Sequence, residues 1–363
     1  MRRTGADEPV RFDTLSTNYI NAPRQGIMNF VLFCLRINFR HAGRRAARCS
    51  VYSGTKSTPL FLVSRDFHIL DMPTKQINTR LRGHLKILAP AKINIGLRVI
   101  RKRSDRYHDI ETVFYPINLS DELEIEKSSK LEFFSNINLE ADANLCLRAL
   151  HFFCERTGIH AEVKMNLFKR IPIGGGLGGG SSDAAAVLLS LQEIYGMPLS
   201  EIELFDIATQ LGADVSFFLK KIPSYATGKG EVIEPISYRI GSYILTVTPD
   251  LSVSTALAYS IVTPTGKHEP RLDELVLDSG ADYSGYRDVI INDFEGPVFE
   301  KFPTIGQIKS EMYSHGAEFS LMSGSGSSVY GFFRTEADAA KALDSLCNSF
   351  TLRAGNITPP HAS

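Results

Sequence analysis

The pattern of hydrophobic and polar residues becomes regular only after about residue 84. Upstream of that point no periodicity is sustained. Downstream, "LKILAPAKINIGLRVI" from Leu85 alternates every second residue with a break at Pro90, and "ELEIE" at residues 122–126 alternates again. Such alternation predicts two strands. The pattern therefore separates an extension, residues 1–83, from a folded remainder.

Helical periodicity and capping residues mark three helices in that remainder. The first helix, "NLCLRALHFFCERTG", ends on Gly158. The second, in "LSEIELFDIATQLG", has Ser200 as its N-cap, and the third, "EADAAKALDSL", begins at about Thr335. Between these helices, "AEVKMNLFKRIPI", "GSYILTVTP" and "FSLMSGSGSSVYGFF" are typical of strands. Because "GSYILTVTP" opens a second unit, we expect two domains, residues 84–238 and 239–363.

Six glycines occupy seven positions in "IPIGGGLGGGSSDAAAVLLS", residues 171–190, directly after a predicted strand. The good helix formers in "AAAVLLSL", residues 184–191, predict a further helix after the glycine run. Such a run costs folding entropy and survives where main chain turns with positive φ or approaches a ligand closely. We expect Ser181, Ser182 and Asp183 to cap the helix, whose N-terminal N–H groups and dipole attract an anion. The loop therefore predicts a nucleotide phosphate site. A flexible linker would be followed by a polar spacer instead.

Two other phosphate-binding patterns do not explain this loop. A P-loop needs Gly-Lys-Ser/Thr, whereas Ser181 and Ser182 follow Gly180. A G-x-G-x-x-G match can be found, but among so many glycines it arises by chance.

The composition is that of a globular chain of about two domains. With 363 residues and a formal net charge of zero, nothing attracts nucleic acid or an anionic membrane, and small-molecule chemistry is favoured. Five scattered cysteines without a C-x-x-C pattern argue against a disulfide framework or a zinc site and favour a reducing cytoplasm. The apolar run "IMNFVLFCL" is too short to span a bilayer.

Residues 1–83 carry more Lys and Arg than Asp and Glu, as organelle-targeting segments do. Acidic residues such as Asp7, Glu8 and Asp13 favour instead a disordered tail, or an upstream start codon with Met72 as the true start. We expect a cytoplasmic protein unless the extension directs it to an organelle.

Three further segments carry unusual residues. Lys92 in "APAKINIGL" and Asp214 in "LGADVSFFL" are charged side chains beside apolar runs, and "SGSGSS" at residues 323–328 is a second glycine-rich turn. Taken singly, Lys92 could extend to solvent, Asp214 could cap a helix, and the turn could close a hairpin. Their occurrence together with the phosphate loop favours an active site.

At these residues the chain resembles the GHMP kinases, ATP-dependent small-molecule kinases with three motifs, here "PAKINIGL", "PIGGGLGGGSS" and "MSGSGSSVYGFF". Three motifs in order, over about residues 85–355, are more specific than any one of them. The resemblance implies an α+β, two-domain GHMP kinase fold, with an N-terminal domain similar to domain 2 of ribosomal protein S5 and a ferredoxin-like C-terminal domain. It also implies ATP and Mg²⁺ as cofactors.

Within the family, one group of members is most similar to this chain. The similarity lies in "AKINIGLRVIRKRSDRYHDIETVF", "GKGEVIEP", "INDFE" and "PDLSVSTALAY", of which we predict the last to be a strand. Those members phosphorylate the 2-hydroxyl of a cytidine diphosphate-linked methylerythritol in non-mevalonate isoprenoid biosynthesis. The resemblance then implies that Asp214 is the base for that hydroxyl and that Lys92 keeps it ionised and orients the hydroxyl or the γ-phosphate.

The same resemblance assigns binding residues. Tyr107 and Tyr259 would stack on the cytosine, His108 would hydrogen-bond it, and Asn94 would lie near the methylerythritol. The loop residues expected to hold ATP are Pro172, Gly174, Gly175, Gly176, Leu177, Gly178, Gly179, Gly180, Ser181 and Ser182. The second glycine turn would contribute to substrate binding through Gly324, Ser325 and Gly326. No metal ligand is assigned, although Ser182 and Asp183 lie in the neighbourhood expected for Mg²⁺.

Two positions depart from the family pattern. The usual Asp-Gly-Tyr-His has Arg106 in place of glycine, and Gly-Ala-Asp-Val-Pro has Ser216 in place of proline. If position 106 takes a positive φ, arginine costs about 1 kcal/mol or more there. Two alternatives stay open: another GHMP kinase of the mevalonate or homoserine type, or a non-catalytic nucleotide-binding paralogue. The sequence leaves the oligomeric state open and is compatible with a homodimer.

Overall fold

The computed structural model describes residues 77–81, 84–140, 144–266, 270–276 and 283–360. Nearly all of the predicted extension lies outside the described residues, including the targeting and start-codon alternatives. Strand β1 (Ile77–Leu81) is the exception, because it pairs antiparallel with the next strand. The sheet therefore begins a few residues before the predicted boundary at residue 83.

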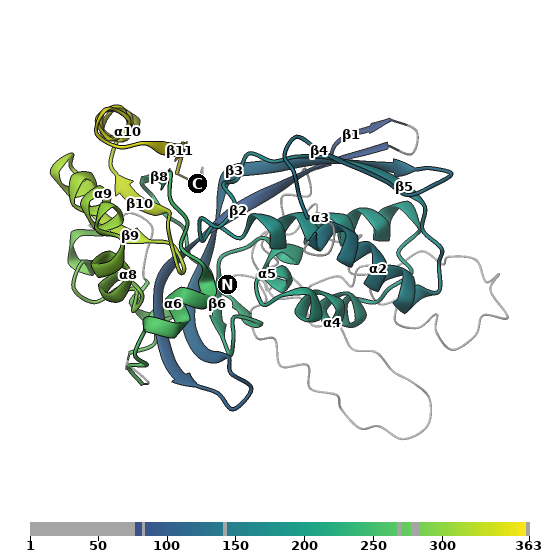
Figure 1. Ribbon diagram of the computed structural model, residues 1–363, viewed down its shortest axis with the longest axis horizontal. Helices are drawn as coiled ribbons and strands as arrows, with labels where there is room; N and C mark the ends of the chain where they lie inside the picture. Colours follow the sequence, from purple (N-terminus) through teal and green to yellow (C-terminus); the bar gives the residue numbers. More distant parts are fainter. Residues whose placement is uncertain (1–76, 82–83, 141–143, 267–269, 277–282, 361–363) are drawn as a thin grey trace, which may run out of the picture. The chain divides into compact units, whose positions relative to one another are not determined.

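A seven-stranded sheet forms the first half of the described chain (Figure 1). Strands β1, β2, β3, β5 and β4 lie side by side in that order, β6 pairs with β3, and β7 pairs with β6. The remaining bounds are β2 His84–Lys102, β3 His108–Lys127, β4 Glu132–Ser135, β5 Val163–Phe168, β6 Ser224–Thr227 and β7 Val232–Pro235. The helices that cover one face are α2 Leu145–Thr157, α3 Gly179–Ile194, α4 Glu201–Leu211 and α5 Val215–Lys220.

A four-stranded antiparallel sheet, in the order β11-β8-β10-β9, forms the second half. Its strands are β8 Tyr243–Pro249, β9 Phe319–Met322, β10 Val329–Phe333 and β11 Leu352–Thr358. The helices are α6 Thr255–Ile261, α7 Leu272–Leu275, the 3₁₀ helix η2 Tyr283–Tyr286, α8 Glu295–Lys301, α9 Pro303–Ser314 and α10 Glu336–Ser349. Helix α9 packs on β9 and β10, and α10 packs on β8 and β11. The mixed architecture agrees with the α+β prediction, and the predicted boundary at 238/239 falls between the two sheets.

Strand β2 connects the two halves. Residues 89–99 are buried without a break, whereas the sequence predicted alternation. The cause is that the second sheet packs on β2 as well: Ile93 and Ile95 share a core with Leu321, and the Tyr330 hydroxyl donates to the Asn94 carbonyl at 3.0 Å. A strand covered on both faces loses its alternation. Pro90 does not interrupt the strand, because a register shift between Pro90 and Lys92 accommodates it.

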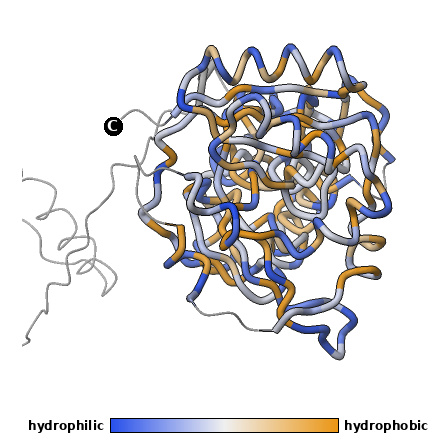
Figure 2. Tube along the Cα trace, turned by 90° about the vertical axis from the view of Figure 1, so that its left-hand side faces the viewer, coloured by the Kyte–Doolittle hydropathy of each residue, from blue (hydrophilic) through white to orange (hydrophobic). Residues whose placement is uncertain are grey.

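Three of the predicted helix ends are confirmed. Ser200 and Glu203 form a capping box at the start of α4, and the Thr335 side chain accepts from Asp338 N at the start of α10. Gly158 ends α2 with φ 69°. Along the helix at the top of Figure 2, hydrophobic and hydrophilic residues alternate, as an amphipathic helix requires. Among the described residues, no helix is both long and apolar enough to cross a bilayer.

Two predictions of local structure are wrong. Ser181, Ser182 and Asp183 do not cap α3, since the helix begins at Gly179 and its N-cap, Gly178, offers no side-chain acceptor. The segment "PDLSVSTALAY" is not a strand, because Ser254 caps helix α6 by accepting from Leu257 N at 3.1 Å. In that segment the serine N-cap outweighs the short alternation.

Candidate active site

A pocket of about 1300 Å³ lies between the glycine loop, the middle of β2, the end of α4 with the residues that follow it, and helix α6. Almost every binding or catalytic residue predicted from the sequence lines it. The exceptions are Ser182, which is fully buried, and Gly326. Gly326 lies beside the Met322 sulfur, where an added Cβ would sit 2.8 Å away. The structure thus brings together residues that are more than 200 positions apart in sequence.

The glycine loop turns with positive φ where the sequence indicated: Gly174 has φ 68°, Gly176 has φ 75° and Gly178 has φ 71°. Packing is a second reason for these glycines. A Cβ on Gly176 would lie 2.1 Å from the Ser323 carbonyl oxygen, and one on Gly178 would lie 2.9 Å from the Phe218 ring. The bare backbone therefore lets the loop fit against its own protein as well as leaving N–H groups open to a ligand.

The two glycine-rich turns are hydrogen-bonded to each other. Ser323 Oγ donates to the Gly176 carbonyl at 3.0 Å, and Ser328 N donates to the Gly175 carbonyl at 3.1 Å. Lys92 N donates to the Leu177 carbonyl at 3.0 Å, which ties the loop to β2 as well. The phosphate loop is consequently held from two sides, and the N-terminus of α3 faces the pocket without a capping side chain. Such a helix end attracts phosphate.

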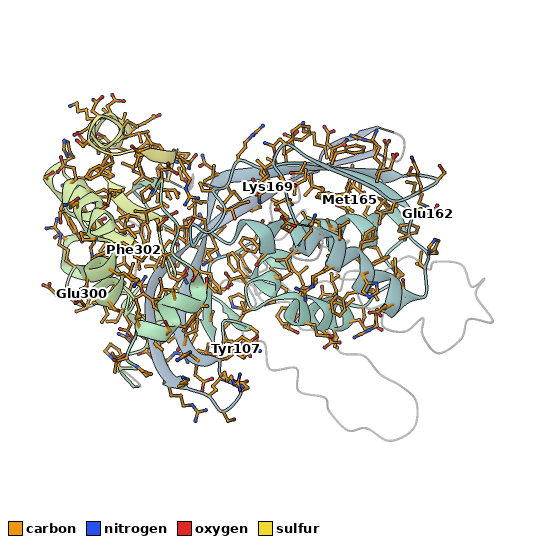
Figure 3. All side chains as sticks on the ribbon, viewed as in Figure 1. Tyr107, Glu162, Met165, Lys169, Glu300 and Phe302 are labelled. Carbon is orange, nitrogen blue, oxygen red and sulfur yellow. The ribbon has the colours of Figure 1, made fainter. Side chains whose placement is uncertain are left out.

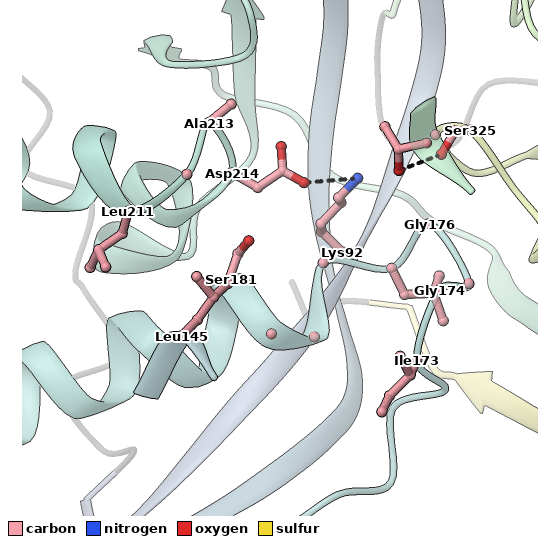
Figure 4. A pocket seen from close by; sticks show the side chains of 18 of the residues that line it. Lys92, Leu145, Ile173, Gly174, Gly176, Ser181, Leu211, Ala213, Asp214 and Ser325 are labelled. Atoms are coloured by element: carbon pink, nitrogen blue, oxygen red, sulfur yellow. Dashed lines mark hydrogen bonds and ion pairs between the residues drawn. The ribbon is translucent and has the colours of Figure 1, made fainter. Parts of the chain in front are cut away.

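Lys92 and Asp214 form an ion pair in the pocket, with Lys92 Nζ 3.5 Å from Asp214 Oδ2. Figure 4 shows the two side chains pointing toward each other. The Lys92 side chain is only 5% exposed, whereas that of Asp214 is 31% exposed. Asp214 stands at the N-cap position of α5 but makes no capping bond, so its carboxylate faces the pocket instead. Neither structural alternative, a solvent-extended lysine or a capping aspartate, describes the pair.

Asn94 fixes Lys92 from the other side. Its Oδ1 accepts from Lys92 Nζ at 2.5 Å, and its Nδ2 donates to Thr112 Oγ1 at 2.9 Å. Thr112 in turn donates to the Gly96 carbonyl at 2.6 Å. This chain of hydrogen bonds orients the Asn94 amide and thereby the ammonium group.

The residues predicted to bind a base lie at the other end of the pocket, at the tip of the β2–β3 hairpin and on α6. The His108 ring stacks on Tyr259, with centroids 4.9 Å apart and planes at 23°. Tyr107 is 60% exposed at the hairpin tip (Figure 3), and Lys229 Nζ lies 4.7 Å from the centroid of its ring. The structure thus places the three aromatic groups together. The His108 ring covers the face of Tyr259 that the cytosine was expected to occupy.

Burial lowers the pKa of His108, and the nearby Lys102 ammonium lowers it further. A neutral imidazole has one N–H donor and one acceptor nitrogen. Burial also raises the pKa of Tyr259, and the Asp214 carboxylate adds to that rise. Tyr259 therefore stands between the base end of the pocket and the Lys92–Asp214 pair.

A buried charge cluster beneath the loop was missed by sequence reasoning. Lys169 Nζ donates to Asp183 Oδ2 at 2.6 Å and also contacts Asp121, and Asp121 accepts from Ile171 N at 2.8 Å. All three charged side chains are at most 5% exposed. The signal in the sequence was a lysine five positions before Gly174, the first glycine of the loop. The cluster ties β3 and the end of β5 to the start of α3.

Two buried oxygens near this cluster have no hydrogen-bond partner within the described ranges, Ser182 Oγ and Asp183 Oδ1. Burial raises the pKa of Asp183 to about 7, against the opposing effect of Lys169. The described residues contain no group of three or more His, Cys, Asp or Glu side chains that could hold a metal ion by themselves.

Comparisons with known proteins identify the class. The family model described as GHMP kinases N terminal domain matches residues 144–221, and that described as GHMP kinases C terminal matches residues 268–352. A crystal structure titled 4-(cytidine 5'-diphospho)-2C-methyl-D-erythritol kinase covers 75% of this chain and 99% of its own, with 37% identity and a TM-score of 0.65. The mevalonate kinase of Methanococcus jannaschii shares the fold alone, with 15% identity over 78% of this chain and all of its own, and a TM-score of 0.58. The chain has the fold of a GHMP kinase, so the predicted fold class is confirmed.

A relative found by sequence similarity indicates which group of GHMP kinases the chain belongs to. The 4-diphosphocytidyl-2-C-methyl-D-erythritol kinase of Chlorobaculum tepidum is 39% identical over 282 residues, which are 76% of this chain and 97% of that protein. The chain belongs to the 4-diphosphocytidyl-2-C-methyl-D-erythritol kinase family.

Proposed function

We propose that the protein transfers the γ-phosphoryl group of ATP to the 2-hydroxyl of 4-diphosphocytidyl-2-C-methyl-D-erythritol, a step of non-mevalonate isoprenoid biosynthesis. One observation carries the proposal. The Lys92–Asp214 ion pair lies in a single pocket that runs from the glycine loop to the Tyr107, His108 and Tyr259 rings. Two of the relatives named above, the Chlorobaculum tepidum protein and the crystal structure with 37% identity, carry the name of a kinase of this substrate.

The geometry supports phosphoryl transfer at the glycine-loop end of the pocket. The loop from Gly174 to Ser181 and the N-terminus of α3 would hold the ATP phosphates through backbone N–H groups. Asp214 would accept the proton of the 2-hydroxyl as its oxygen bonds to the γ-phosphorus and the bond to ADP breaks. Lys92 would keep Asp214 ionised and stabilise charge on the transferring group. Asn94 then acts through Lys92, as a positioning residue.

Mg²⁺ would accompany ATP and neutralise phosphate charge. Asp183 lines the pocket at the N-terminus of α3, and its Oδ1 has no hydrogen-bond partner within the described ranges, so this oxygen would hold the ion. One protein ligand is enough, since Mg²⁺ usually takes several more from phosphate and water.

At the base end, Tyr107 and Tyr259 would enclose the cytosine while His108 pairs with its edge. A neutral His108 presents one donor and one acceptor, which matches a base edge that carries both kinds of group. Stacking tolerates any base, so the choice of cytosine would depend on these hydrogen bonds. Binding would require the His108 ring to leave the Tyr259 face. A cytoplasmic or organellar location and a homodimer stay predictions.

The proposal is tested by following ADP release from Mg-ATP with 4-diphosphocytidyl-2-C-methyl-D-erythritol, mevalonate or homoserine as acceptor. We expect turnover only with the cytidine-linked acceptor. Turnover of mevalonate or homoserine instead would contradict the proposed substrate but keep the Lys92–Asp214 chemistry. Absence of turnover with all three would favour the non-catalytic paralogue.

A further inference from the structure

The tip of the β2–β3 hairpin contains a strained residue that faces the pocket. Arg106 has φ 71°, a left-handed backbone conformation that costs a side chain-bearing residue about 1 kcal/mol or more. It lines the pocket next to Tyr107 and His108. Strain of this kind persists where the surrounding structure fixes it, and it concentrates at ligand sites.

The carboxylates of the hairpin are already engaged by other groups. Asp109 accepts from Arg101 at 2.5 Å and from Arg103 at 2.8 Å. Asp105 accepts from Arg103 at 3.1 Å and from Tyr107 N at 3.1 Å. No ion pair joins Arg106 to a carboxylate among the residues that the structure describes. Its guanidinium is therefore free to meet a ligand.

Two lysines strengthen the positive field at this place. Lys102 and Lys229 line the same pocket, and neither forms an ion pair in the described parts of the chain. Burial lowers the pKa of His108 and the Lys102 ammonium adds to the effect. The pKa of Asp105 is lowered against the effect of its burial, by the Tyr107 N–H and Arg103 and, to a smaller extent, by Lys229. Three cations thus border the base end of the pocket, which is the environment that a phosphate group requires.

We infer that Arg106 binds the diphosphate of the substrate, with Lys102 and Lys229 supplying supporting charge, and so selects acceptors that carry a nucleoside diphosphate. This inference rests on the proposed function. The diphosphate links the cytidine, whose base would lie on Tyr107, to the methylerythritol, whose hydroxyl would lie at Asp214. Arginine suits the role because its planar fork donates two hydrogen bonds to one phosphate.

The test uses the full-length protein and the variants Arg106→Gly, Arg106→Lys and Arg101→Ala. Dissociation constants of cytidine 5'-diphosphate and of cytidine are measured by calorimetry at low and high salt, together with KM for both substrates and the melting temperature. Arg101 is the matched control, because it lies on the same hairpin, is 74% exposed and pairs with Asp109 outside the pocket.

We expect Arg106→Gly to weaken cytidine 5'-diphosphate binding about tenfold, with cytidine and the KM for ATP nearly unchanged. The salt dependence should shrink with it, and Arg106→Lys should lose less. Glycine also relieves the backbone strain, so the melting temperature should stay equal or rise. If Arg106 had only a structural role, Arg106→Gly would lower both the affinity for cytidine 5'-diphosphate and the melting temperature.

Three results would overturn the inference: unchanged affinity for cytidine 5'-diphosphate, an equal loss for cytidine, or an equal loss in Arg101→Ala. If the wild type does not phosphorylate the cytidine-linked acceptor but binds cytidine 5'-diphosphate in an Arg106-dependent way, the inference stands and the proposed function fails. If the wild type binds neither cytidine ligand, both fail.

Discussion

At the glycine-loop end of the pocket the important groups are buried and tied together, whereas at the base end they stand near the surface. Lys92 is 5% exposed and is held by Asn94 and Asp214. Tyr107 is 60% exposed, and its ring contact is the flexible ammonium of Lys229. Figure 3 shows Tyr107 well apart from Lys169, which anchors the loop end.

This difference follows the tasks of the two ends. Phosphoryl transfer depends on placing a base and charged groups accurately, which a network of buried contacts achieves. Recognition of a base can be adjusted by single surface residues. The departure at Arg106 accordingly lies at the exposed end. The other departure, Ser216, lies two residues after Asp214 at the loop end, where its side chain is buried. Four experiments test the contrast.

The largest effect should come from Asp214→Asn. Asparagine keeps the shape of the side chain but cannot take the proton, so we expect kcat to fall about a thousandfold with little change in the KM for ATP. Steady-state kinetics measure both. Asp206→Asn is the control, because Asp206 lies on the neighbouring helix α4 and pairs with Arg156 at the surface. A variant that retained most of its kcat would refute the assignment of the base.

Lys169→Met tests whether the loop end depends on its buried charges. Asp121 and Asp183 would remain buried without their cation, and we expect a loss of about 3–5 kcal/mol in the free energy of unfolding. Urea denaturation measures it. Lys130→Met, which removes a cation that is 72% exposed, should cost at most about 1 kcal/mol. Equal effects in the two variants would show that the cluster does not hold the loop.

The pH dependence of the free energy of unfolding also tests whether the loop end depends on its buried charges. Because burial raises the pKa of Asp183 to about 7 in the folded state, the folded protein holds a proton that the unfolded chain has released. The stability from this group is fully present below its unfolded pKa, about 3.9, and is lost as the pH rises through about 7. Asp183→Asn should remove this loss, so its stability relative to wild type should rise between these pH values. Parallel curves for the two proteins would contradict the shift.

The smallest effect is expected at the base end. Tyr107→Ala should raise the KM for the cytidine-linked acceptor about tenfold, since stacking contributes about 1–3 kcal/mol per base, and should leave kcat within about threefold. Tyr107→Phe keeps the ring and should match wild type. A large fall in kcat for Tyr107→Ala would mean that the two ends of the pocket are not separable.

The local elements were predictable where one strong signal acts alone. Ser200 and Thr335 begin their helices and Gly158 ends its helix as predicted, because capping depends on residues a few positions apart in sequence. The start of α3 was not predictable in the same way. Gly178 occupies the N-cap position because its bare backbone lets Phe218 and Lys92 pack closely, and these residues come from other parts of the chain.

The sequence by itself indicated the phosphate loop and singled out Lys92 and Asp214, because a glycine run and charged residues beside apolar segments are local features. The α+β class followed from the resemblance of three motifs to the GHMP kinases. Tertiary structure alone decided that Ser323 closes on Gly176, that Lys169 joins Asp121 to Asp183, and that Arg106 takes a positive φ beside the pocket. These features arise where segments distant in sequence meet. Burial and packing between such segments then determine the charge state of the Lys169 cluster and the backbone conformation of Arg106, which local sequence patterns do not specify.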